Sequence, residues 1–191
     1  MAAFYSGENN MRQYDFRRRR SIRLKNFDYS SAGAYFFTLC VQNRVCVLGH
    51  VIDGRMELNQ AGSIVSSEWL RTADVRHNVH LDEFVVMPDH FHGIIILDRI
   101  IDGPGSLQEC SHPTADRSFR LHPDSLGSII GQFKSIATKR IRLYGQHNFQ
   151  WQRNYFEHII RNEREFTAIR EYIINNPIKW WYDEKNFDQW Q

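Results

Sequence analysis

The sequence of 191 residues has few cysteines and no long apolar runs, and both shortages exclude classes of protein. Its three cysteines, Cys40, Cys46 and Cys110, are odd in number and lack Cys-x-x-Cys spacing. A disulfide framework is therefore not expected, and a reducing cytosol fits. No apolar run approaches the ~18 residues of a membrane span, and the polar N-terminus does not resemble a secretory signal. These features predict a cytoplasmic protein with no membrane partner.

The sequence also lacks a large net charge, an internal repeat and a glycine-rich phosphate loop. Its formal net charge of +2 does not by itself indicate a nucleic-acid partner. The basic residues are unevenly spread, however. One run without any acidic residue contains Arg17, Arg18, Arg19, Arg20, Arg23 and Lys25. Such a run is typical either of a nucleic-acid contact or of a solvated tail.

A second basic segment runs from Ser125 to Tyr144, again without an acidic residue. It carries Lys134, Lys139, Arg140 and Arg142. Its apolar residues recur at helical spacing, which predicts an amphipathic helix with a basic outer face. That face is either merely solvated or follows a phosphate backbone, and the pattern alone leaves both open.

Hydrophobic periodicity predicts an α+β domain. The nearly all-apolar segment 34–41 predicts a buried central strand, and Asp53-Gly54 predicts the turn of a hairpin within 44–59. Further strands are expected at 80–86, 92–97 and 151–160. Helices are expected at 61–75 after an Asn59 cap, at 125–144, and from Asn162 to about Asn175, where Pro177 stops the helix. This order predicts an antiparallel sheet with helices packed on one face.

The same pattern predicts one domain with two appendages. Residues 1–30 read as a basic N-terminal arm and residues 31–178 as the domain. Residues 98–124 read as a long flexible loop, which is usually functional or disordered; Cys110, His112 and His122 within it do not make a convincing metal site. Residues 179–191 form an aromatic-rich tail that either packs back on the domain or stacks on bases.

Two histidines at 90 and 92 open an aliphatic run, His90-Phe91-His92-Gly93-Ile94-Ile95-Ile96-Leu97. In a β-strand, residues two apart project to the same face, so both imidazoles would lie side by side as nitrogen ligands. Taken alone, a His-x-His pattern more often marks two ordinary histidines than a metal site.

Tyr172 and Asn176 are four residues apart and therefore share one face of the last predicted helix. Alone, they read as a packing tyrosine and an asparagine near a helix end. Tyr155 is an equally good nucleophile on the residues alone, because its strand could neighbour the histidines. His158 could shuttle a proton or contact a phosphate, although a half-buried strand histidine is the more ordinary interpretation.

In combination these features resemble the HUH single-tyrosine transposases, and most closely the REP-associated tyrosine transposases. The resemblance covers roughly residues 20–180 and rests on ordered blocks. These are Met87-Pro88-Asp89-His90-Phe91-His92, Ser125-Leu126-Gly127-Ser128-Ile129-Ile130, Trp151-Gln152-Arg153-Asn154-Tyr155-Phe156-Glu157-His158-Ile159-Ile160-Arg161-Asn162-Glu163, and Tyr172-Ile173-Ile174-Asn175-Asn176-Pro177. The long loop and the Trp-rich tail depart from the family pattern.

The resemblance implies a ferredoxin-like domain that cleaves and rejoins single-stranded DNA through a 5′-phosphotyrosine intermediate. It implies Tyr172 as the nucleophile and His90, His92 and Asn176 as ligands of a divalent metal. This set of nitrogen and oxygen ligands suits Mg²⁺ or Mn²⁺. The implied partners are DNA hairpins with single-stranded flanks, and the implied assembly is a monomer or a homodimer.

The basic residues supply the expected DNA contacts: Arg17, Arg18, Arg19, Arg20, Arg23, Lys25, Lys134, Lys139 and Arg142, with His158 as a further candidate. Two other functions remain open from the sequence. One is a catalytically silent protein that binds DNA hairpins and keeps the fold. The other is a replication initiator or relaxase of the same chemistry, which normally carries further domains.

Overall fold

The computed structural model describes residues 29–98 and 124–188. The basic run of the predicted arm and nearly all of the predicted loop lie outside these residues. Four strands form the main sheet and two form a separate hairpin: β1 (Gly33–Cys40), β2 (Gly49–Ile52), β3 (Arg55–Leu58), β4 (Val79–Val86), β5 (His90–Leu97) and β6 (Phe156–Ile160). The helices are α1 (Gln60–Asp74), α2 (Leu126–Leu143), α3 (Glu163–Ile174) and α4 (Asn176–Asp188).

The main sheet is antiparallel, with the order β4-β5-β1-β6. With the hairpin set aside, the chain runs β1, α1, β4, β5, α2, β6, which is the ferredoxin-like βαββαβ arrangement. The expected α+β class and the ferredoxin-like sheet are therefore confirmed. The central position of β1 between β5 and β6 explains why this strand is apolar almost throughout.

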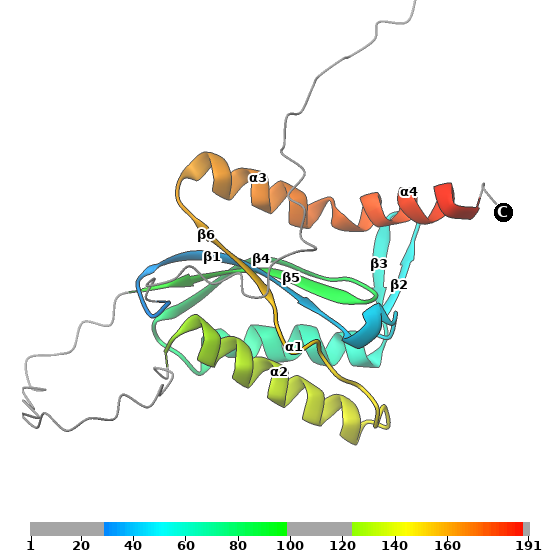
Figure 1. Ribbon diagram of the computed structural model, residues 1–191, viewed down its shortest axis with the longest axis horizontal. Coiled ribbons are helices and arrows are strands. Elements are labelled where there is room, and N and C mark those ends of the chain that lie inside the picture. The colour runs from blue at the N-terminus through cyan, green and yellow to red at the C-terminus, as the bar shows by residue number, and fades with distance from the viewer. Residues whose placement is uncertain (1–28, 99–123, 189–191) are drawn as a thin grey trace, which may run out of the picture.

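Helices cover both faces of this sheet, which corrects the expectation of helices on one face. Figure 1 shows α1 and α2 beneath the sheet and α3 above it. The lower core contains Phe37, Trp69 and Phe133, whereas the upper core contains Phe36 and Ile173. Because neighbouring residues of β1 point to opposite faces, each face of the strand needs its own cover.

Local signals place most element ends where the sequence predicts them. The Asn59 side chain accepts from the Gly62 N–H at 3.0 Å, and the Asn162 side chain accepts from the Glu165 N–H at 2.9 Å, so each caps its helix. The hairpin turns at Asp53-Gly54 with φ of 48° and 74°. Positive φ at both positions is what a tight two-residue turn requires.

The segment 151–160 is only partly a strand, because β6 begins at Phe156. Trp151 instead forms an isolated bridge with Val41. Lys134 of α2 donates to the carbonyl of Gln152 at 2.7 Å and to that of Arg153 at 3.1 Å, which ties this stretch to α2. Tyr144, which closes the predicted helix 125–144, follows the last residue of α2 and is 60% exposed.

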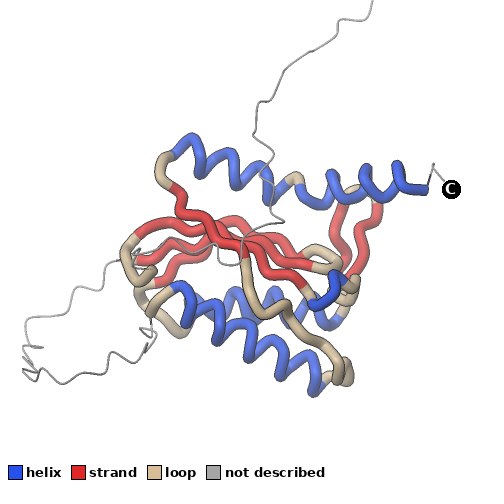
Figure 2. Tube along the Cα trace, viewed as in Figure 1, coloured by secondary structure: helices blue, strands red, loops and turns tan. Residues whose placement is uncertain are grey.

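A break in the helical C-terminal region lies at Asn175-Asn176-Pro177. Helix α3 ends at Ile174, and α4 begins at Asn176 with Pro177 in its first turn. Proline cannot continue α3, because it lacks an N–H, but it suits the first turn of a new helix. Figure 2 shows α3 and α4 as two successive helices above the sheet and the hairpin. The predicted tail from residue 179 thus begins inside α4.

None of the described helices is both long enough and apolar enough to span a membrane.

Candidate functional site

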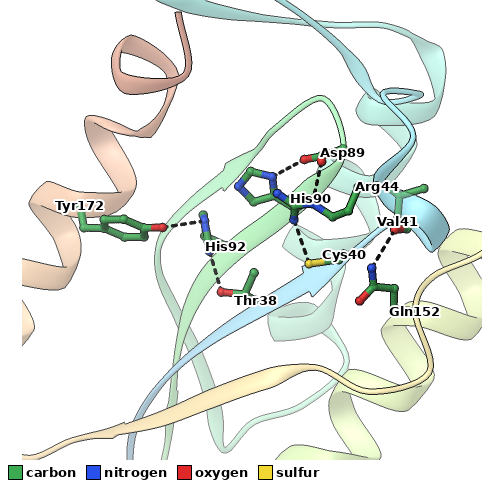
Figure 3. Close-up of polar contacts among 9 residues, drawn as sticks. All are labelled: Thr38, Cys40, Val41, Arg44, Asp89, His90, His92, Gln152 and Tyr172. Carbon is green, nitrogen blue, oxygen red and sulfur yellow. Dashed lines mark hydrogen bonds and ion pairs between the residues drawn. The ribbon is translucent and has the colours of Figure 1, made fainter. Parts of the chain in front are cut away.

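The two histidines lie at the start of β5, on the face that α3 covers. His90 and His92 are 5% and 4% exposed, and their ring centroids are 4.6 Å apart. Asp89 Oδ1 lies 2.5 Å from His90 Nδ1, and Thr38 Oγ1 lies 2.8 Å from His92 Nδ1. With Nδ1 engaged in both rings, Nε2 is the nitrogen that each ring presents to a ligand. Figure 3 shows both arrangements.

The site favours a neutral imidazole at His92. Burial lowers the pKa of His92 well below its usual value, and the neighbouring His90 and Arg44 lower it further. An imidazole must be neutral to bind a metal, because the ligating nitrogen needs its lone pair. His92 is therefore ready for coordination at neutral pH without first losing a proton.

Tyr172 of α3 reaches this pair of histidines. Its hydroxyl lies 3.3 Å from His92 Nε2, and its ring meets Phe36 edge-on. Burial raises the pKa of Tyr172 above its usual value, while a hydrogen bond with Asn176 and the charge of Arg44 oppose the rise. The phenol is therefore protonated at neutral pH and stands beside the nitrogen that faces a ligand.

Asn176 completes the group from the first residue of α4. It is 8% exposed and hydrogen-bonded to Tyr172, so the helix junction brings its amide to the tyrosine that contacts His92. Two imidazole nitrogens and one amide oxygen would form a mixed nitrogen and oxygen donor set, which Mn²⁺ or Mg²⁺ can accept with water or phosphate oxygens in the remaining positions. The described residues contain no cluster of three or more His, Cys, Asp or Glu side chains arranged to hold a metal, so the amide matters here.

Two rival residues lie away from this group. Tyr155 packs against the lower core, on the opposite face of the sheet from His90 and His92. His158 is engaged by Glu165, with Nε2 2.6 Å from Oε1, close to the start of α3. The structure thus places Tyr172 and not Tyr155 beside the histidines, and it gives His158 a partner that anchors the helix.

The predicted DNA-binding residues of α2 have mixed surroundings. Lys134 is tied to two backbone carbonyls, and Arg142 donates from Nε to the Phe149 carbonyl at 3.0 Å. Lys139 lines a broad open hollow beside Lys134 and Arg142. This surface belongs to the face of α2 below the sheet, away from Tyr172. The six predicted DNA-binding residues of the arm lie outside the described residues.

Three residues near the histidines were not predicted as part of the site: Thr38, Asp89 and Arg44. Asp89 could have been found, because a carboxylate next to a metal-binding histidine commonly orients the ring. Thr38 becomes visible only through the pairing of β1 with β5, which sets Thr38 opposite His92. Arg44 follows an irregular turn that no periodic pattern reveals.

Comparison with known proteins finds relatives that match most of the chain. The chain is 41% identical over 174 residues to an uncharacterised protein of Haemophilus influenzae, covering 89% of this chain and 94% of that protein. It is 23% identical over 163 residues to a protein of the same organism named as a REP-associated tyrosine transposase, covering 82% and 77%. No protein-family model matches the chain.

A solved structure of a REP-associated tyrosine transposase bound to a REP hairpin has the same fold. The TM-score is 0.54 at 23% identity, and the match covers 82% of this chain and 73% of that one. The sequence match and the shared fold agree with the resemblance inferred from the motifs.

Proposed function

We propose that the chain is a transposase like the REP-associated tyrosine transposases that it resembles in sequence and fold, and that it cleaves and rejoins single-stranded DNA with Tyr172 as the nucleophile. The observation that carries the proposal is the convergence of three elements on one point. The Tyr172 hydroxyl from α3 lies 3.3 Å from His92 Nε2 on β5, and Asn176 from α4 bonds to the same tyrosine.

The proposed reaction transfers a phosphodiester from DNA to the protein. The Tyr172 oxygen attacks the scissile phosphorus and gives up its proton to water. The bond from phosphorus to the 3′ oxygen breaks, and that oxygen takes a proton to become a 3′-hydroxyl. The 5′ side of the break stays linked to Tyr172 as a phosphotyrosine. Because a phosphodiester is kept, a second 3′-hydroxyl can attack it and complete strand transfer.

We propose that His90, His92 and Asn176 hold one Mg²⁺ or Mn²⁺ ion. When bound, such an ion supplies Lewis-acid neutralisation of the charge on the phosphate. Asp89 and Thr38 turn the two imidazoles so that Nε2 faces the ion, an orienting role that outer hydrogen bonds commonly have. Contacts with Phe36 and Asn176 support the position of Tyr172 beside His92.

The proposed substrate is a DNA hairpin with a single-stranded flank. A hairpin is what the structural relative was solved with, and Tyr172 on a half-buried helix face cannot reach a stacked, paired strand without distortion. A role in mobilising palindromic repeats follows from this substrate. The second candidate, a silent hairpin-binding protein, has less support, because Tyr172 and all three proposed ligands are present and Tyr172 contacts both His92 and Asn176.

The test is formation of a covalent complex. Wild-type protein and Tyr172→Phe are incubated with an end-labelled hairpin oligonucleotide and Mn²⁺, then separated on a denaturing gel. We expect a labelled protein band for wild type and none for Tyr172→Phe. Tyr155→Phe is the matched control and should form the band. Binding of the hairpin without any covalent band in wild type would favour the silent alternative.

A further inference from the structure

The turn after β1 brings a cation to the proposed site. Arg44 lies at the end of a short 3₁₀ turn (Gln42–Arg44), where Asn43 and Arg44 have φ of 57° and 56°. A left-handed backbone is unfavourable for residues with a side chain, and such strain is concentrated at functional positions. Here it directs the Arg44 side chain back over the end of β1.

Neighbouring backbone bonds hold this turn against the loop that precedes the histidines. The Val41 N–H donates to the Asp89 carbonyl at 2.8 Å, and the N–H groups of Val47 and Leu48 donate to the Pro88 carbonyl at 3.0 Å each. The turn is therefore bonded directly to the loop that leads into the histidine strand. These bonds position Arg44 beside the start of β5.

The guanidinium of Arg44 has both a fixed side and an open side. Nε lies 2.8 Å from Asp89 Oδ2, and NH1 donates to Cys40 Sγ at 3.0 Å. Asp89 is nearly buried, whereas the Arg44 side chain is 47% exposed. Within the part of the chain that the structure describes, these two contacts engage Nε and NH1 and leave NH2 for a ligand. Figure 3 shows Arg44 between Asp89 and Cys40, beside His90.

Arg44 lies beside a histidine that would meet the scissile phosphate. One carboxylate joins the two residues, because Asp89 Oδ2 lies 2.8 Å from Arg44 Nε and Asp89 Oδ1 lies 2.5 Å from His90 Nδ1. Guanidinium groups are well suited to phosphate, because they are planar, always charged and donate along two directions.

From this geometry we infer that Arg44 binds a non-bridging oxygen of the scissile phosphate and neutralises the charge that develops there during attack. The inference rests on the proposed function and adds a protein cation to it. Asp89 then has two tasks, since one of its oxygens orients His90 and the other fixes Arg44.

A competing role for Arg44 is purely structural, in which it only steadies Asp89 and thereby His90. The two roles differ in metal affinity. Removal of a phosphate-binding group leaves Mn²⁺ binding nearly unchanged, whereas removal of a support for His90 weakens it. The experiment therefore measures Mn²⁺ affinity and the single-turnover rate of covalent complex formation for wild type, Arg44→Ala, Arg44→Lys and Arg55→Ala. Arg55 is an exposed residue of β3 and supplies the matched change of charge.

At saturating Mn²⁺ we expect Arg44→Ala to slow complex formation about 100-fold, as removal of one charge-stabilising donor typically does. Its Mn²⁺ affinity should stay within about threefold of wild type. Arg44→Lys should recover part of the rate, and Arg55→Ala should match wild type. A hairpin with a methylphosphonate at the cleaved bond, which lacks the charged oxygen, should bring wild type and Arg44→Ala to similar rates.

Three results would overturn the inference. Arg44→Ala at the wild-type rate would overturn it while leaving the proposed function intact. A rate deficit that excess Mn²⁺ removes would assign Arg44 to ligand support alone. A wild-type protein that forms no covalent complex would overturn the proposed function together with the inference that rests on it.

Discussion

At the scale of single residues, the site depends on hydrogen bonds that determine which ring nitrogen each histidine presents to a ligand. Thr38 and Asp89 both engage Nδ1, and Tyr172 lies opposite Nε2 of His92. His90, His92, Tyr172 and Asn176 were singled out from the sequence through the family resemblance, because their spacing alone fits ordinary residues equally well. Thr38 could not be predicted, because its position depends on the register between β1 and β5.

We predict that Thr38→Val weakens Mn²⁺ binding by roughly 10- to 100-fold, because the valine cannot hold Nδ1 of His92. The substitution keeps the shape of the side chain, so the free energy of unfolding should change by only about 1 kcal/mol. Mn²⁺ titration followed by electron paramagnetic resonance measures the affinity. Thr72→Val, which removes a buried hydroxyl bonded to Glu68 in α1, is the control. Equal Mn²⁺ affinity in both variants would contradict this role for Thr38.

Asn176→Ala should lower Mn²⁺ affinity by at least about tenfold and should slow covalent complex formation as well, since one side chain serves the metal and Tyr172. The neighbouring Asn175→Ala is the matched control, because Asn175 is exposed at the end of α3. Unchanged affinity in Asn176→Ala would remove it from the proposed ligand set.

At the scale of elements, α3 has to hold Tyr172 above the sheet. Arg170 does this from two residues away: Nε donates to Asp82 Oδ1 at 2.7 Å and NH2 to Asp82 Oδ2 at 2.6 Å, which joins α3 to β4. At the start of the same helix, Glu165 accepts from the Arg161 N–H and contacts His158. Helix α3, which carries Tyr172, is thus bonded to β6 near its start and to β4 near its end.

The tie between Arg170 and Asp82 predicts a pH dependence of stability. The hydrogen bond from Arg170 holds the pKa of Asp82 below its usual 3.8. Because the pKa of Asp82 is lower in the folded than in the unfolded protein, its ionised carboxylate stabilises the fold at pH values above the unfolded-state pKa. This stabilisation is lost as the pH falls through the folded-state pKa. The stability difference between wild type and Asp82→Asn should therefore be constant from pH 7 to 5 and shrink below 3.8. Urea unfolding across this range measures it.

The exposed neighbour Glu83→Gln serves as the control for that series, because it removes a carboxylate without removing the paired contact. We also expect Asp82→Asn to slow complex formation, because α3 is less firmly placed. A stability difference for Asp82→Asn that does not change below pH 3.8 would contradict the assignment.

The sequence predicted the ends of several helices and the hairpin turn, but it did not predict which face of the sheet α3 covers. The caps at Asn59 and Asn162 and the Asp53-Gly54 turn are local signals, and the structure confirms them. The placement of α3 on the second face was predicted wrongly. The signal was present, because β1 alternates Phe36 and Phe37 and so needs apolar cover on both sides.

At the scale of the whole molecule, some basic residues of α2 bind other segments of the chain, whereas Lys139 lines the open hollow on its surface. Lys134 and Arg142 hold the segment 149–153, and Arg140 pairs with Glu68 of α1. Burial lowers the pKa of Lys134, in keeping with an inward position. Net basic charge on a helix is therefore a weak guide to DNA contact when partners lie far away in the sequence.

We predict that Lys134→Gln lowers the free energy of unfolding by about 1–3 kcal/mol, because two carbonyls lose a charged donor. Lys139→Gln should instead leave stability unchanged. It should reduce the slope of log affinity for DNA against log salt concentration by about 0.9, the value for a single phosphate neutralised by a cation. Urea unfolding and fluorescence anisotropy at several salt concentrations separate the two effects. Identical salt slopes in Lys139→Gln and wild type would exclude Lys139 from the DNA interface.

The central claim is that Tyr172, and no other tyrosine, becomes linked to DNA. Mass spectrometry of the covalent complex tests it most directly, after digestion with nuclease and trypsin. The account predicts a nucleotide mass on the peptide 171–179, and none on a peptide that contains Tyr155. A nucleotide on Tyr155, or no modified peptide at all from protein that binds the hairpin in Mn²⁺, would contradict it.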